Sequence, residues 1–183
     1  MNTLQNQTAT PESVWGILQE ITKKQEETDR QMQETDRRMK ELQKSVGSIT
    51  NNYGSFAEEY FFNSFEKGQQ NFFGKKFDEI SRNLELVWKN LKDEYDIVLY
   101  NDDAVAIIEV KFKAHENDIN TVLKKAETFK ILLPNYKDFN IYLGLASMSF
   151  YPALEKKCIE NGIAIIKQVG DKVVINDKHL KVY

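Results

Sequence analysis

The sequence predicts an α/β domain with a mixed central sheet flanked by helices, preceded by a long N-terminal coiled-coil helix. This prediction rests on a heptad repeat near the N-terminus, strand-like segments in the middle, and alternating helices and strands toward the C-terminus. At 183 residues and 41% hydrophobic content, the chain can form one globular domain and an extension. We therefore expect residues 1–53 to form an oligomerisation helix and residues 54–183 to form the globular domain.

Composition narrows the class of protein. The formal net charge is −3 and the sequence pI is about 5.6, so the chain lacks the overall basic character typical of nucleic-acid-binding proteins. A single cysteine, Cys158, excludes an internal disulfide framework. The sequence shows no signal peptide and no apolar run near 20 residues, which predicts a cytoplasmic protein with no membrane partner.

The N-terminal helix is expected to begin after Thr10, which suits an N-cap, and to end at Gly54. Its heptad repeat is unbroken. The a positions are Leu18, Gln25, Met32, Met39, Val46 and Tyr53, and the d positions are Val14, Ile21, Thr28, Thr35, Leu42 and Ile49. A helix that is polar outside one apolar stripe needs a partner, and Lys24 at g faces Asp29 at the next e in a parallel pair. We expect a parallel homo-oligomer; the alternative is a single helix packed back on its own domain.

The globular domain is read as a series of short elements. The expected order is an aromatic-rich helix (54–65), a loop (67–74), two strands (75–83 and 84–89), a β-hairpin whose second strand covers 104–113, a helix (117 or 118 to 133), a strand (140–146), a helix (151–160) and a last hairpin (163–168 and 172–175). Strands that come first, followed by alternating helices and strands, favour a mixed sheet.

The central hairpin places charged residues in an apolar setting. Its two Val- and Ile-rich runs are joined by Asp102 and Asp103, and counting outward from that turn puts Asp96 opposite Glu109. Cross-strand neighbours have Cβ atoms about 5 Å apart, and Lys111 shares a face with Glu109.

Two carboxylates at that distance repel one another, and burial raises the free-energy cost. A divalent cation with hard oxygen ligands would offset the repulsion, and an ammonium beside it could hold a water molecule, so the three residues suit a hydrolytic site. The alternative is an exposed edge hairpin on which the same residues form a solvated ion cluster.

The spacing of these residues is similar to a known signature. Asp96, followed after 12 residues by Glu109-Val110-Lys111, resembles the motif of the PD-(D/E)XK nuclease superfamily, the restriction-endonuclease-like fold. The resemblance covers about residues 54–170, and Tyr95 stands where the motif name has proline. Gly54-x-x-x-Glu58 is similar to the first motif of the archaeal Holliday-junction resolvase-like branch, and the whole chain resembles bacterial proteins that join an N-terminal coiled coil to such a domain.

The resemblance implies a metal-dependent nuclease acting on DNA. Asp96, Glu109 and the Val110 carbonyl would bind Mg²⁺, with Mn²⁺ as a possible substitute. Lys111 would orient the attacking water or help to deprotonate it. Glu58 would complete the metal shell directly or through water.

Other residues have implied or alternative roles. Glu59 replaces Glu58 if the helix has a different phase, although both acids also suit the first turn of a helix for electrostatic reasons alone. Lys113, and Lys124 or Lys125 on the following helix, are the expected contacts to substrate phosphates.

The charge of the globular domain leaves two other interpretations open. Residues 1–53 hold 7 Lys+Arg and 8 Asp+Glu of the chain's 25 and 28, which leaves 18 and 20 for the domain. A domain of charge about −2 lacks the usual nucleic-acid footprint. The alternatives are a coiled-coil adaptor or assembly protein with an idle nuclease fold, and a surface ion cluster on an unrelated domain.

Overall fold

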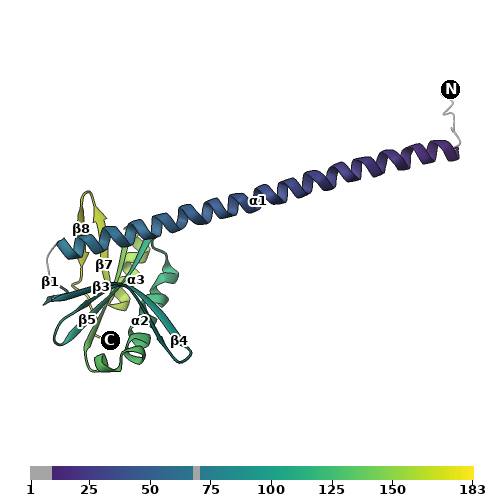
Figure 1. Cartoon of the computed structure of the whole chain (residues 1–183). Helices are drawn as coiled ribbons and strands as arrows, with labels where there is room; N and C mark the ends of the chain where they lie inside the picture. Colours follow the sequence, from purple (N-terminus) through teal and green to yellow (C-terminus); the bar gives the residue numbers. More distant parts are fainter. Residues whose placement is uncertain (1–9, 68–70) are drawn as a thin grey trace. The chain divides into compact units, whose positions relative to one another are not determined.

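The computed structural model describes residues 10–67 and 71–183; the first nine residues, and 68–70 of the expected loop, lie outside the described part (Figure 1). The chain divides between Ile49 and Thr50 into two compact units. The first unit is helical, and every described residue of it is exposed, including the apolar a and d positions.

Helix α1 (Pro11–Lys67) begins where the sequence predicts. The Ser13 backbone N–H donates to Thr10 Oγ1 at 3.3 Å and the Thr10 N–H donates to Ser13 Oγ at 3.1 Å, which is a reciprocal cap. The expected end at Gly54 is wrong, because the helix continues to Lys67. A helical glycine costs only about 1 kcal/mol, and burial of Ala57, Phe61 and Phe65 beyond it outweighs that cost.

A mixed sheet forms the centre of the second unit, as predicted, and it has six strands. Its order follows the sequence: β3 (Glu79–Trp88), β4 (Leu91–Tyr100), β5 (Ala104–Lys113), β6 (Asn140–Ser149), β7 (Ala164–Val169) and β8 (Lys172–Asn176). Strands β3, β4 and β5 are antiparallel, β5, β6 and β7 are parallel, and β8 returns antiparallel to β7. The two strands expected over 75–89 are instead β2 (Lys75–Lys76), paired with β1 (Asn71–Phe72), and the single long β3.

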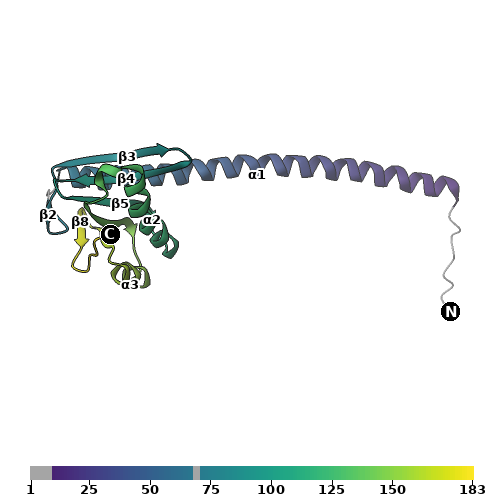
Figure 2. The same ribbon diagram turned by 90° about the horizontal axis from the view of Figure 1, so that it is seen from below.

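Helices cover both faces of the sheet (Figures 1 and 2). One face packs against α2 (Glu116–Leu132) and α3 (Pro152–Asn161), which are joined through η1 (Pro134–Tyr136) and β6. The other face packs against the last turns of α1. Among the described residues, no helix combines the length and the hydropathy needed to cross a membrane.

In strands β3 and β4, the alternation of side chains between the two faces of the sheet is interrupted at one position. Residues two apart on a strand normally share a face, yet Tyr95 packs in the core on the α2 side and Ile97 in the core on the α1 side. Opposite them, Asn83 has a positive φ of 49°. The strands pair on both sides of Asn83 and Asp96, but no ladder pair joins these two residues. The switch turns Asp96 out of the regular sheet.

Candidate functional site

The β4–β5 hairpin has the predicted register. The Asn101 N–H donates to the Ala104 carbonyl at 3.0 Å, and Asn101 Oδ1 accepts from the Asp103 and Ala104 N–H groups at 3.0 and 2.7 Å. The asparagine side chain thus closes the turn. The ladder then runs outward to the pair Ile97 and Ile108. The count that placed Asp96 opposite Glu109 is therefore correct as a register.

The two strands part at the next position, which sequence alone did not predict. Asp96 Oδ2 accepts a hydrogen bond from the Val110 N–H at 2.7 Å, so its carboxylate occupies the opening between the strands. Burial, followed by the Glu109 charge, raises the pKa of Asp96 to about 7, although the Val110 hydrogen bond and Lys111 oppose the rise. Burial and the neighbouring Glu109 carboxylate both disfavour the charged form of Asp96.

Glu109 and Lys111 lie on the same face of β5, as predicted. Glu109 is 5% exposed, and its Oε1 lies 2.6 Å from Lys111 Nζ. Burial lowers the pKa of Lys111, but the charge and hydrogen bond of Glu109 outweigh burial and raise it overall. The lysine is therefore an ammonium at neutral pH, which favours hydrogen-bond donation over proton acceptance.

Lys125 joins the same group from α2. Its ammonium is 2.8 Å from Asp93 Oδ1 and 3.7 Å from Glu109 Oε2, and it also donates to the Glu94 carbonyl. The residue is only 8% exposed. Burial alone would raise the pKa of Asp93, but hydrogen bonds from Lys125 and Thr128 lower it overall. Lys125 thus holds β4 and Glu109 together from inside the domain.

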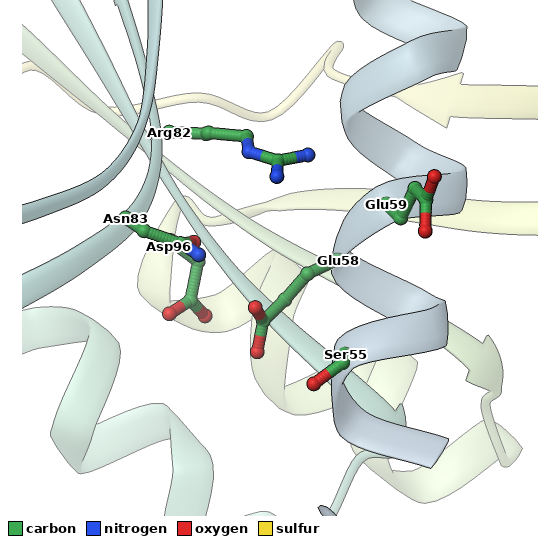
Figure 3. Close-up of a pocket in the computed structure, with 6 residues that line it drawn as sticks. All are labelled: Ser55, Glu58, Glu59, Arg82, Asn83 and Asp96. Atoms are coloured by element: carbon green, nitrogen blue, oxygen red, sulfur yellow. The ribbon is translucent and has the colours of Figure 1, made fainter. Parts of the chain in front are cut away.

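Helix α1 brings Glu58 to the other side of Asp96. Both line a pocket of about 190 Å³, and Figure 3 shows their carboxylates directed toward each other. Burial first, and then Glu94, raises the pKa of Glu58, while Lys111 lowers it. Glu59 also lines the pocket, but Figure 3 shows its side chain on the far side of the helix from Asp96. The helix phase therefore favours Glu58.

The two remaining expected phosphate contacts are exposed. Lys113 is exposed at the end of β5, and Lys124 is exposed on α2. Each is therefore free to meet a ligand, in contrast to the buried Lys125.

Three residues at the site were not predicted as site residues. Ser55, Arg82 and Asn83 line the pocket with Glu58 and Asp96 (Figure 3). The signal for Asn83 is an asparagine inside a strand-like run, a residue type that tolerates positive φ and often marks a local break. Arg82 carried no signal, because one arginine in a strand is ordinary.

The donor set suits a hard divalent cation. Asp96 and Glu109 are carboxylates whose charges interact, and the Val110 carbonyl adds a third oxygen of the type that Mg²⁺ prefers. Across residues 10–67 and 71–183, no group of three or more His, Cys, Asp or Glu side chains is placed to hold a metal ion. Asp96 and Glu109, with the Val110 carbonyl, would hold the ion, and Glu58 lines the pocket beside Asp96.

Comparisons of the chain with protein-family models, curated proteins and solved structures found no match. The chemistry of the site is defined by its own residues. Two hard carboxylates, a protonated lysine and a third acid across a pocket match the requirements of metal-assisted hydrolysis of an anionic ester.

Proposed function

We propose that the chain is a Mg²⁺-dependent nuclease that hydrolyses phosphodiester bonds in DNA, with a PD-(D/E)XK, restriction-endonuclease-like fold. The observation that carries this proposal is the convergence of Asp96, Glu109 and Lys111 where β4 leaves β5, with Glu58 across the pocket. The order of elements supports it: a helix bearing an acid, an antiparallel meander bearing the other three residues, then helix, parallel strand, helix and parallel strand.

Each residue has a distinct part in the proposed reaction. Asp96, Glu109 and the Val110 carbonyl hold Mg²⁺ or Mn²⁺, and the ion, when bound, supplies Lewis-acid polarisation of the phosphate. Lys111 remains protonated and donates a hydrogen bond that orients the attacking water. Glu58 completes the metal shell directly or through an intervening water.

Self-association through the first 49 residues belongs to the same proposal. The polar d positions Thr28 and Thr35 donate their hydroxyls to the Lys24 and Gln31 carbonyls of their own helix at 2.8 Å. They can therefore be buried against a second helix without leaving an unsatisfied hydroxyl. A parallel pair would give each particle two sites, which suits cutting both strands or a branched DNA.

The test is Mg²⁺- and Mn²⁺-dependent cleavage of labelled linear, single-stranded, flapped and four-way DNAs and of RNA. We expect wild type to cut at least one DNA and Lys111→Ala to cut it about 100-fold or more slowly, because removing one positioned hydrogen-bond donor costs about that factor. Lys137→Ala is the matched control, since Lys137 is exposed and lies 4.0 Å from Asp138. A folded wild type that cuts no substrate and gains no thermal stability from either metal would leave the idle adaptor as the better interpretation.

A further inference from the structure

The site pocket contains an arginine without a salt-bridge partner. Arg82 lies on β3, and Figure 3 shows its guanidinium extended toward α1, above Glu58 and Asp96. Its guanidinium carbon is 5.3 Å from the Phe62 ring centroid, a cation–π contact that leaves the hydrogen-bonding edges of the group open. No salt bridge joins Arg82 to any carboxylate among the described residues.

The change of face in β3 places a second hydrogen-bond donor beside Arg82. Ile80 packs in the core on the α1 side and Leu84 in the core on the α2 side, so the strand changes face between them. The left-handed backbone of Asn83 makes that change, and as a result the consecutive residues Arg82 and Asn83 both line the pocket. A regular strand would direct them to opposite faces.

The pocket is lined by more acidic than basic side chains, so an anionic ligand needs hydrogen-bond donors there. Its lining carries the carboxylates Glu58, Glu59 and Asp96, and Arg82 is the only cation among the described residues that line it. A DNA backbone approaching three carboxylates is repelled unless fixed donors meet its phosphates. A guanidinium can bind a phosphate through two parallel hydrogen bonds. Packing against Phe62 does not use those donors.

We infer that Arg82 and Asn83, with the Ser55 hydroxyl, bind a phosphate of the substrate backbone next to the one that is cleaved. This inference rests on the proposed nuclease function and adds a subsite to it. Arg82 supplies the charge, the Asn83 amide and Ser55 hydroxyl supply neutral donors, and the Phe62 ring keeps the guanidinium aimed across the pocket. The subsite makes binding depend on the charge of one phosphate.

The test measures binding without cleavage. Affinity of the full-length chain for a labelled DNA that wild type cuts, or for a four-way DNA if it cuts none, is followed by anisotropy in Ca²⁺ over a range of salt concentrations. We expect Arg82→Met, which keeps an apolar stem on Phe62, to bind about 10-fold more weakly and to reduce the salt slope by about 0.7 to 0.9, the value for one lost phosphate contact. Arg82→Lys should bind DNA with an affinity between those of wild type and Arg82→Met. Arg37→Met is the control, because Arg37 is an exposed arginine of the N-terminal unit and does not line the pocket. Its nearest ion-pair contact, with Glu41, is a long one of 3.8 Å.

Two further variants separate a phosphate contact from a structural effect. Asn83→Gly keeps the positive φ and removes the amide, so we expect a loss of a few fold in affinity with an unchanged melting temperature. A DNA in which single phosphates are replaced in turn by neutral methylphosphonates should weaken wild type at one linkage and leave Arg82→Met unaffected there.

The outcomes distinguish this inference from the function beneath it. A wild type that binds DNA but never cuts it, with Arg82→Met binding more weakly at a smaller salt slope, overturns the hydrolysis and keeps the subsite. A wild type that cuts DNA, with Arg82→Met unchanged in affinity and salt slope, overturns the subsite alone. A wild type that binds no nucleic acid overturns both.

Discussion

At the scale of single residues, Asp96 has a strongly raised pKa. Burial and the Glu109 charge raise its pKa to about 7, far above its usual value of 3.8. The raised pKa means that the folded state binds a proton more tightly than the unfolded state between about pH 4 and 7. Ionising Asp96 in the absence of metal therefore costs stability as pH rises through that range, and the cost is complete above pH 7.

Asp96→Asn should accordingly stabilise the metal-free protein at pH 8 by about 1–3 kcal/mol, since it removes a charge that burial disfavours. The gain should shrink as pH falls and vanish at about pH 3 and below, where the wild-type carboxyl is protonated in both states. Urea unfolding at several pH values in EDTA measures this. A variant that is less stable than wild type at pH 8 would show that the repulsion is already compensated. Saturating Mg²⁺ should stabilise wild type and not Asp96→Asn.

Lys125 leads to the opposite expectation. Its ammonium is buried among Asp93, Glu109 and the Glu94 carbonyl, so Lys125→Met leaves two acids facing an apolar side chain. Removing one partner of a buried ion pair costs about 3–5 kcal/mol. We expect a loss near 3 kcal/mol in denaturant unfolding.

Lys92→Met is the matched control for that loss. Lys92 pairs with Glu85 at 2.7 Å, but both side chains are more than half exposed, and such pairs contribute about 0–1 kcal/mol. Equal effects of the two substitutions would contradict the interior role assigned to Lys125.

At the scale of elements, the glycines of two helices make contrasting predictions. Gly54 is helical, and a Cβ there would meet no atom within 4 Å, so Gly54→Ala should stabilise the chain by about 0.5–1 kcal/mol. Gly162 ends α3 with φ at 69°, and a Cβ there would meet the Lys181 side chain. Gly162→Ala should destabilise by about 1–2 kcal/mol. Thermal melts of the two variants should shift in opposite directions, and a shared direction would contradict this assignment of helix and cap.

Most elements of the domain followed from local signals in the sequence. The α3 cap at Gly162, the α2 helix before Pro134 and the hairpin register set by Asn101 each depend on turn and cap chemistry within a few residues. The elements that were mispredicted depend on tertiary contacts. The continuation of α1 through Gly54 is stabilised by packing against the sheet, and the long β3 is held by its pairing with β4.

The site, like the fold, was predictable where its residues lie close in sequence and not where tertiary contacts bring them together. Asp96, Glu109 and Lys111 lie close in sequence on one hairpin, so spacing alone relates them. Their neighbours come from elsewhere: Lys125 from α2 and Arg82 from β3. The parting of the strands at Asp96 also could not be predicted, because it requires the change of face at Asn83 on the adjacent strand.

At the scale of the whole molecule, the exposed apolar stripe of the N-terminal unit is the basis of the proposed self-association. Leu42, Val46 and Ile49 are each more than half exposed in the single chain. Isolated helices of mainly polar residues are marginal in water, so we propose that a partner helix stabilises this unit. A second copy offers the same stripe with the same heptad spacing.

We expect wild type to have at least twice the 21.4 kDa mass of the chain in light scattering at micromolar concentration, with a melting temperature that rises with concentration. Leu42→Asp places a charge at a d position and should give the monomer mass, while Lys40→Asp, at the outward b position, should leave the mass unchanged. Cleavage of a single strand should survive Leu42→Asp, because Asp96, Glu109 and Lys111 belong to one domain. Paired cuts on duplex or branched DNA should be lost, because they need two sites in one particle. A monomeric wild type, or paired cutting by the Leu42→Asp monomer, would contradict the link between the helix and the reaction.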